Sequence, residues 1–348
     1  MRVVLADPPA FTPAYDHELA AALARAGADV DLVTSHFRFG EAPRPLGYRR
    51  VESFYPVSSR VFRRSPLRVP LKVVEHVPGT IDLVRRRPDV LHVQWLAAPE
   101  LDRVLLRPRV PSVFTAHDVL PRRTASNRAL WQTLFARFDR IVVHSEHGRR
   151  ALADVGVDAC VIAHPVFPSD PPRADDGRTV LSFGVIRPYK GLGDAIAAVK
   201  QVDGARLLVA GDPLESVNGY RAQAGDRAEW RLGYLPATEV ERALGEATVA
   251  VFPYRPELDQ SGALLQVLGA GIPVVAYDVA GIAEPVKRFG AGRVVEGGNV
   301  GGLADALREL LNDPDALRGA RNGARRAREE LTWDAAAQSH LDLYRELA

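Results

Sequence analysis

The sequence predicts an α/β protein built from two doubly wound halves, each a parallel sheet covered by helices. Three observations carry this prediction. Short runs rich in β-branched residues alternate with longer segments of helical period, which is the pattern of βαβ units. The 348 residues suffice for about two domains. A stretch at 165–177, with four prolines and no hydrophobic period, separates two such series of similar length.

The series before the proline-rich stretch alternates strand and helix candidates. Strands are expected at residues 3–6, 30–34, 90–94, 112–116, 141–144 and 161–163. Helices are expected at residues 15–26, 71–86, 128–137 and 147–155. This series predicts a first, acceptor-side Rossmann-like domain at 1–166.

The pattern restarts after the proline-rich stretch. Strands are expected at residues 179–184, 206–210, 249–253, 273–276 and 293–295, and helices at 192–200, 237–246, 261–270 and 303–311. This predicts a second Rossmann-like domain at 177–330. Two more helices are expected at 314–328 and 333–347, and residues 331–348 are expected to pack back on the first domain. Ligands of open α/β sheets bind beyond the carboxyl ends of the strands, so we expect a site in a central cleft that the two domains face.

Composition narrows the class of protein. Apolar residues make up 47% and charged residues 25%, close to the average of soluble globular proteins. The longest apolar runs fall far short of the roughly 20 residues of a membrane-spanning helix. The opening seven residues resemble a buried strand more than a secretory signal, so we expect a cytoplasmic protein. The lone Cys160 excludes an internal disulfide and a cysteine-based metal cluster.

A basic segment lies between Arg44 and Lys72, where eight basic residues accompany one acid, Glu52. Such a segment could meet an anionic lipid, a phosphorylated acceptor or nucleic acid, and a solvated loop is the plainer alternative. We do not expect a nucleic-acid partner for this segment. We retain peripheral contact with the inner face of the membrane, which would give access to a lipid-linked acceptor.

The turn after the first strand of the second half carries two cations. Arg187 and Lys190 lie three residues apart, between Gly184 and Gly191. Glycine lets the backbone approach a ligand closely, while an arginine fork and a compact ammonium suit the oxygens of a diphosphate. This turn is therefore a candidate diphosphate site, with a solvated turn as the alternative.

A second candidate lies at 253–273, where a strand ends, a polar loop follows and Ser261-Gly262 opens an apolar helix. A helix start offers unbonded N–H groups and a positive dipole end to an anion. This start therefore predicts a phosphate seat. A plain N-cap is the alternative for Ser261, and a solvent-facing amide is the alternative for Gln266.

These two motifs, with the stretch 274–284 that follows, resemble the retaining, GT-B-fold glycosyltransferases of family 4 (group 1). The resemblance covers essentially the whole chain. It implies that Arg187 and Lys190 hold the diphosphate of a nucleotide sugar, that Ser261 and Gly262 grip its distal phosphate, and that Gln266 meets the ribose. It implies that His117, after the strand at 112–116, contacts the donor sugar near the reacting carbon. The expected donor-binding residues are Gly184, Asp259, Gln260, Ser261, Gly262, Ala263, Gln266 and Glu284, and the expected catalytic residues are His117, Arg187 and Lys190.

The sequence departs from the family at the usual pair of glutamates, which falls on Leu258 and Gln266. Asp259 takes the first place if the loop register differs by one. The family's N-terminal glycine pair is also replaced, by the proline-rich residues 8–13. No cluster has credible metal spacing, and the resemblance implies no metal and no cofactor besides the nucleoside-diphosphate sugar.

We therefore expect retaining transfer of a sugar to an acceptor hydroxyl, in the synthesis of a glycan, a glycolipid or a natural-product glycoside. The acceptor itself stays unknown. The departures leave two alternatives on the same fold: a non-catalytic nucleotide-sugar-binding subunit and a nucleotide-sugar 2-epimerase.

Overall fold

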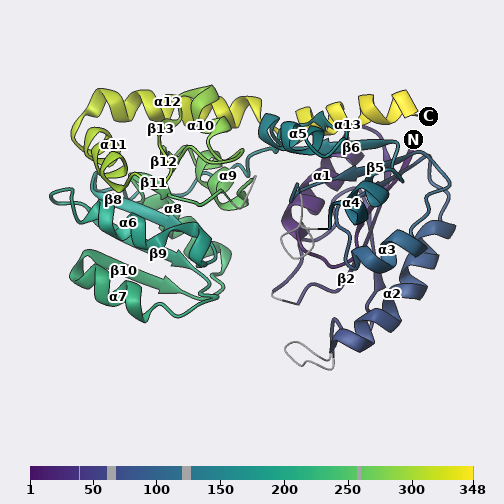
Figure 1. Ribbon diagram of the computed structural model, residues 1–348. Helices are drawn as coiled ribbons and strands as arrows, with labels where there is room; N and C mark the ends of the chain where they lie inside the picture. Colours follow the sequence, from purple (N-terminus) through teal and green to yellow (C-terminus); the bar gives the residue numbers. More distant parts are fainter. Residues whose placement is uncertain (39, 61–67, 120–126, 257–259, 348) are drawn as a thin grey trace. The chain divides into compact units, whose positions relative to one another are not determined.

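The computed structural model describes residues 1–347 except 39, 61–67, 120–126 and 257–259 (Figure 1). The chain divides into two compact units. The first unit comprises Met1–Ala163 and Trp333–Ala348, and the second comprises His164–Thr332. The chain therefore leaves the first unit once and returns to it at its end.

The described residues of the first unit form a seven-stranded, wholly parallel sheet with the strand order β3-β2-β1-β4-β5-β6-β7. The strands are β1 (Arg2–Asp7), β2 (Asp29–Ser35), β3 (Arg49–Phe54), β4 (Val90–Val93), β5 (Ser112–Thr115), β6 (Arg140–Val143) and β7 (Cys160–Val161). The order reverses between β1 and β4, which is the switch point where open parallel sheets bind ligands.

Helices connect these strands, and the last helix of the chain joins them. They are α1 (Pro13–Arg25), α2 (Arg68–Arg85), α3 (Pro99–Leu105), α4 (Arg128–Phe135), α5 (Glu146–Ala153) and α13 (Trp333–Leu347). Side-chain caps explain where two of them begin, since Asn127 accepts from the Leu130 N–H and Ser145 from the Gly148 N–H. A buried 2.6 Å hydrogen bond between His92 on β4 and the Tyr344 hydroxyl anchors α13 to the sheet.

The second unit repeats this topology. Its described residues form a six-stranded parallel sheet with the order β10-β9-β8-β11-β12-β13, and the order reverses between β8 and β11. The strands are β8 (Thr179–Phe183), β9 (Arg206–Gly211), β10 (Ala228–Leu232), β11 (Val249–Phe252), β12 (Val274–Tyr277) and β13 (Gly292–Val295).

The helices of the second unit include several with clear start signals. They are α6 (Leu192–Val199), α7 (Asn218–Ala224), α8 (Ala237–Glu246), α9 (Gly262–Gly269), α10 (Glu284–Phe289), α11 (Val300–Asn312) and α12 (Pro314–Glu330), with 3-10 turns η1 (Pro188–Lys190) and η2 (Gly225–Arg227). Asn299 caps α11 and Asp313 caps α12, where proline takes the first helical position. Valines and leucines of the strands and of α6 and α11 form the core.

The proline-rich stretch is part of the second unit. Its backbone hydrogen-bonds to Gly269 and to Gly245, from Ser169 N and Ala174 N at 3.2 and 3.0 Å. A Cβ added at Gly269 would lie 2.0 Å from the Phe167 carbonyl oxygen, and one added at Gly245 would lie 2.2 Å from the Pro172 carbonyl oxygen. The stretch is thus packed against the second unit at two places where only glycine fits.

Helix lengths and hydropathy also bear on membrane insertion. In the part of the chain that the structure describes, no helix combines the length and the apolar character needed to cross a bilayer.

Candidate functional site

The turn after β8 is pressed against the loop after β11. Gly191 has a φ of +68°, and a Cβ added there would lie 2.0 Å from the carbonyl oxygen of Pro253. A hydrogen bond of 2.8 Å from Arg255 N to Tyr189 O joins the same two segments. The two sequence motifs therefore meet at the switch point of the second sheet, because β8 and β11 are its neighbouring central strands.

Lys190 lies in this contact. Its ammonium donates a 2.6 Å hydrogen bond to the hydroxyl of Tyr254, and it lies 4.4 Å from the centre of that ring. The same hydroxyl accepts a 3.3 Å hydrogen bond from Ser261 Oγ. Tyr254 is buried, and burial raises the pKa of its hydroxyl well above the ordinary value. The phenol therefore stays protonated beside the ammonium.

The start of α9 completes the arrangement. Ser261 is the N-cap of α9, and its Oγ accepts from the Leu264 N–H at 3.3 Å. The N–H groups of Gly262 and Ala263 occupy the first two helical positions, where no acceptor exists within the helix. A Cβ added at Gly184 would lie 3.0 Å from the Ala263 Cβ and 3.6 Å from the Lys190 ammonium. The Lys190 ammonium and the positive start of α9 thus lie next to Gly184, which has no side chain.

The other residues predicted for this site lie in several places. Arg187 is exposed, just before the 3-10 turn. Gln260 Nε2 contacts the Gly281 carbonyl oxygen at 3.5 Å, which links the loops after β11 and β12. Gln266 on α9 and Glu284, the first residue of α10, are half-buried. Asp259 and Leu258 lie outside the described residues.

His117 lies at the carboxyl edge of the first unit's sheet, directly after β5. Its Nε2 is 2.9 Å from Gln94 Oε1, and its Nδ1 is 3.2 Å from His144 Nε2. His144 Nδ1 in turn donates to the Ile162 carbonyl oxygen at 2.9 Å, and burial lowers the pKa of His144 to about 4. A neutral His144 that donates from Nδ1 accepts at Nε2, so Nδ1 of His117 is the donor in the contact between the two rings.

Aromatic rings enclose the same imidazole. Trp95 stacks on His117 with ring centroids 5.1 Å apart, and Tyr15 meets it edge-on at 4.7 Å. Contacts on the face and at the edge of the ring restrict its rotation. Gln94 and Trp95, which follow β4 directly, therefore hold His117 in one orientation.

Two buried carboxyl groups lie close by, Asp7 at the end of β1 and Asp16 on α1. The Thr12 N–H donates to Asp7 at 3.1 Å, and its hydroxyl, which accepts from Trp95 Nε1 at 2.8 Å, is 3.4 Å from Asp16. Burial raises the pKa of both carboxyl groups, and the charge of Asp7 raises that of Asp16 further. Burial and mutual repulsion therefore disfavour two charged carboxylates at these positions.

Sequence reasoning missed Tyr254 in the second unit and Asp7, Gln94 and Trp95 in the first. A positional signal existed for the last three, because each is at or just past the carboxyl end of a buried central strand. The described ranges contain no cluster of three or more His, Cys, Asp or Glu side chains that could hold an ion.

The basic segment is less uniformly positive than its composition indicates. Arg49 pairs with Asp31 at 2.6 Å, and Glu52 pairs with Arg60 at 2.9 Å and with Arg50 at 3.7 Å. Arg63 and Arg64 lie outside the described residues.

Comparisons with known proteins agree with this architecture. The family described as "Glycosyl transferases group 1" matches residues 177–313, and "Glycosyltransferase Family 4" matches residues 15–169. A glycogen synthase of Mycobacterium tuberculosis is 29% identical over 292 residues, 74% of this chain and 69% of that protein. A D-inositol 3-phosphate glycosyltransferase of Mycobacterium bovis is 28% identical over 315 residues, 78% of this chain and 62% of that protein.

Solved structures share the fold over the full length. Sucrose-phosphate synthase from Thermosynechococcus elongatus has a TM-score of 0.76 at 19% identity, covering 100% of this chain and 99% of the other. The Anabaena protein HepE, solved with UDP-glucose, has a TM-score of 0.72 at 15% identity and full coverage of both chains. The predicted two-domain α/β GT-B fold is thereby confirmed. Taken with the two family matches, this shows that the chain belongs to the group 1 glycosyltransferases.

Proposed function

We propose that this glycosyltransferase takes its sugar from a nucleoside-diphosphate donor whose diphosphate binds the second unit. The observation that carries the proposal is the meeting of the Lys190 ammonium and the start of α9 around Gly184. Fixed cations and unbonded N–H groups at a switch point are the features that bind diphosphates in such sheets. The UDP-glucose bound to the Anabaena neighbour supports a nucleotide sugar as the donor.

In this proposal the second unit stabilises the leaving group. Negative charge builds on the departing diphosphate while the sugar becomes oxocarbenium-like. Lys190 and the amides of Gly262 and Ala263 meet that charge with groups that are already in place. Arg187, which has no ion-pair partner among the described residues, supplies a second cation. We expect Gln266 to contact the ribose, and Gln260 and Glu284 to line the sugar side.

We propose that transfer retains the configuration of the anomeric carbon. The bond from this carbon to the phosphate oxygen breaks while the acceptor oxygen bonds on the same face. The acceptor's proton passes to the departing phosphate oxygen. No protein base is then needed, and the charge on the phosphate is met by side chains and amides rather than by a divalent ion or a further cofactor. We therefore expect turnover to survive a chelator.

We also propose that His117 contacts the donor sugar near its reacting carbon. Both of its ring nitrogens already bond to Gln94 and His144. An N–H can therefore reach a sugar hydroxyl only if one of these bonds is exchanged. The remaining contact surface is the ring edge, which can pack against the sugar without losing either bond.

The test begins with a thermal-shift screen of uridine, guanosine, adenosine and thymidine diphosphates, since a bound ligand stabilises the folded protein by mass action. We expect one base to dominate, and the matching nucleotide sugar to be turned over in the presence of acceptor sugars. The anomeric configuration of the product, read by proton NMR, reports retention. Inversion would contradict the proposed path.

The same assay separates the two alternatives. A non-catalytic subunit would bind the nucleotide but release no sugar, with water or with any acceptor. An epimerase would change the sugar while it stays on the nucleotide. Absence of any nucleotide-dependent stabilisation would contradict the donor site itself.

For the acceptor we propose peripheral contact with an anionic membrane through α2 and the basic segment. The helix exposes Val69 and Val74, each about two-thirds accessible. Apolar side chains next to arginines are typical of segments that lie on lipid surfaces. Replacing Val69 and Val74 by Ser should reduce sedimentation with vesicles containing phosphatidylglycerol, and absence of vesicle binding by the parent protein would contradict this contact.

A further inference from the structure

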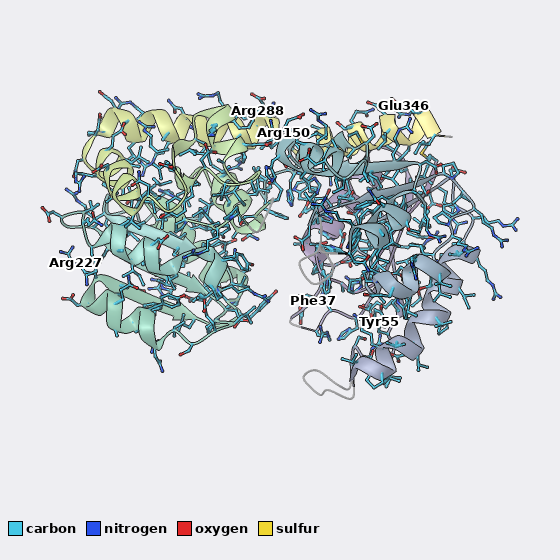
Figure 2. All side chains as sticks on the ribbon, in the orientation of Figure 1. Phe37, Tyr55, Arg150, Arg227, Arg288 and Glu346 are labelled. Atoms are coloured by element: carbon cyan, nitrogen blue, oxygen red, sulfur yellow. The ribbon has the colours of Figure 1, made fainter. Side chains whose placement is uncertain are left out.

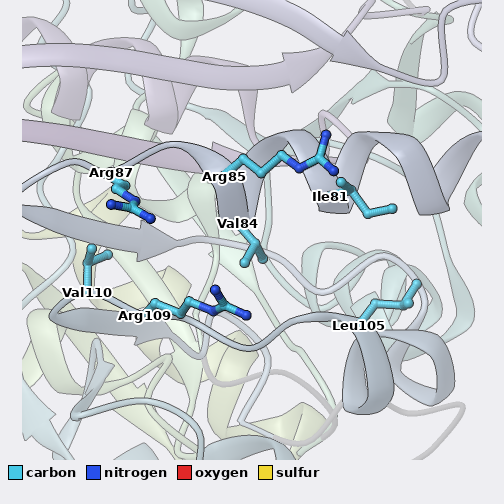
Figure 3. A pocket seen from close by; sticks show the side chains of 7 residues that line it. All are labelled: Ile81, Val84, Arg85, Arg87, Leu105, Arg109 and Val110. Atoms are coloured by element: carbon cyan, nitrogen blue, oxygen red, sulfur yellow. The ribbon is translucent and has the colours of Figure 1, made fainter.

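A pocket of about 460 Å³ opens at the amino-terminal edge of the first unit's sheet (Figure 3). Its walls are the end of α2 with the loop to β4, and the end of α3 with the loop to β5. Three arginines and four aliphatic side chains line it: Arg85, Arg87, Arg109, Ile81, Val84, Leu105 and Val110. The pocket has the size of a small-molecule site.

This pocket is separate from the edge that carries His117. The loops that line it precede β4 and β5, whereas Gln94 and His117 follow those strands. Each strand has four residues, so the two edges are about 13 Å apart along the strands. A ligand in the pocket would not contact His117.

The three arginines of the pocket lack counterions. Among the described residues, none of their guanidinium groups forms an ion pair or a hydrogen bond, whereas the neighbouring Arg86 pairs with Asp82 at 2.9 Å. In Figure 3 the three side chains lie around Val84. Three positive charges around an apolar side chain repel one another, and a bound anion would offset this repulsion.

The walls of the pocket are fixed by buried polar contacts. His76 on α2 donates from Nε2 to Asp102 on α3 at 2.7 Å, and its Nδ1 is 2.8 Å from the hydroxyl of Tyr55. Tyr55 is labelled in Figure 2. Asp102 also accepts from the Ala98 N–H at 2.9 Å. The two helices that border the pocket, one of which carries Arg85, are therefore held together without a ligand, which lowers the ordering cost of binding.

We propose that this pocket binds a phosphate ester, with the phosphate between the arginines and the organic part on the aliphatic lining. Guanidinium forks match phosphate oxygens in a bidentate way, and several cations favour a dianion over a carboxylate. A soluble metabolite and the headgroup of an anionic lipid both present such a group.

The experiment uses the intact protein and hexyl phosphate as the probe, followed by isothermal titration calorimetry. The pocket variant replaces Arg85, Arg87 and Arg109 by Ser. The control variant replaces Arg128, Arg140 and Arg150 by Ser. These three arginines are exposed and lie in the same unit outside the pocket, so the control removes the same charge. Hexyl phosphate could also enter the donor site, so the titration is repeated on Lys190→Ala. A further variant with Lys at the three pocket positions keeps the charge but loses the forks.

We expect hexyl phosphate to bind the parent with a Kd of about 1 mM or tighter. The pocket variant should bind at least about tenfold more weakly, the Lys variant several-fold more weakly, and the control and Lys190→Ala about as well as the parent. Vesicles of phosphatidylcholine with and without phosphatidylglycerol form the second arm. Vesicle binding that depends on the pocket arginines, without hexyl phosphate binding, would support the phosphate site and identify a lipid as its source. Equal losses in the pocket and control variants, or no binding of either probe, would overturn the proposal.

Discussion

Each unit has a switch point in its parallel sheet, but the side chains at the two switch points differ in charge. At the switch point of the second sheet, Lys190 and the start of α9 place positive charge around Gly184. At the switch point of the first sheet, Asp7, Asp16 and Gln94 are buried and bonded to their own neighbours. One edge thus gathers positive charge, whereas at the other edge Asp7 and Asp16 each keep one buried oxygen, Oδ1, without a hydrogen-bond partner among the described residues. The doubly wound topology fixes where a site lies, and the local residues decide what it binds.

The sharpest test of the comparison is Lys190→Ala. Loss of a preorganised cation at the leaving group should lower kcat about 10²–10³-fold, or about 2.7–4 kcal/mol of barrier. Lys200→Ala is the matched control, because its exposed ammonium bonds only to the Gln223 carbonyl oxygen among the described residues. Initial rates with the preferred nucleotide sugar provide the measurement. Equal rates for the two variants would contradict the role given to Lys190.

The buried, neutral histidines of the first unit should make the free energy of unfolding depend on pH. Burial lowers the pKa of His144 to about 4 and that of His340 to about 3, against an ordinary value of 6.5. Between the folded and the ordinary pKa values, the unfolded chain binds more protons than the folded chain. With respect to these two histidines, the free energy of unfolding is therefore highest above pH 6.5, and it decreases as the pH falls toward 4. For His144 the loss is about 3 kcal/mol.

Urea unfolding at several pH values measures this effect. The free energy of unfolding should depend less steeply on pH in His144→Gln than in the parent. Gln201→Asn, an exchange of one exposed, non-ionisable side chain for another, should keep the parent's slope. The same slope in all three proteins would show that His144 does not carry this effect.

Comparing Gly184→Ala with Gly204→Ala separates the effect of backbone strain from the effect of crowding at the donor site. Its φ of +101° disfavours any Cβ, and the added methyl would crowd Ala263 and the Lys190 ammonium. We expect a loss of about 1 kcal/mol in stability and about tenfold in nucleoside-diphosphate affinity. Gly204→Ala, with a φ of +71° and only an ordinary 3.9 Å contact between the added Cβ and the Arg178 side chain, should lose similar stability but keep its affinity. Calorimetric titration compares the two, and equal affinities would remove Gly184 from the site.

Tyr254→Phe should have the smallest effect. The ring remains against the Lys190 ammonium, but the hydroxyl that Lys190 and Ser261 share is lost. One net hydrogen bond corresponds to about 1 kcal/mol, or about fivefold in nucleotide affinity. Tyr234→Phe, at an exposed ring, is the control and should bind like the parent. A change that is equally large at Tyr234 would show that the effect is not local.

Most of the fold could be predicted because central strands and long helices carry strong periodic signals. The two strands that sequence reasoning missed, β3 and β10, lie at one edge of each sheet. Edge strands are less buried, and both carry arginine and glutamate in place of an apolar run. The missed helices α3, α7 and α10 span fewer than eight residues, too few to establish a helical period.

The candidate site divides in the same way. The second unit's residues lie in two short motifs, so Gly184, Lys190 and Ser261 could be predicted from local sequence. The first unit's contacts join distant positions, such as Gln94 to His117 and His117 to His144, over 23 and 27 residues. Pairings of this length depend on strand order and register, which local patterns do not determine.

Helix α13 has a practical consequence for dissecting the enzyme. Its Tyr344 hydroxyl bonds to His92 on a central strand, and His340 is buried beside the same imidazole. A truncation after Thr332 would remove α13 from the first unit, take away the hydrogen-bond partner of His92 and expose apolar side chains of the sheet and of α1 that α13 covers. Anyone expressing the amino-terminal half alone should therefore fuse residues 333–348 to it through a short linker.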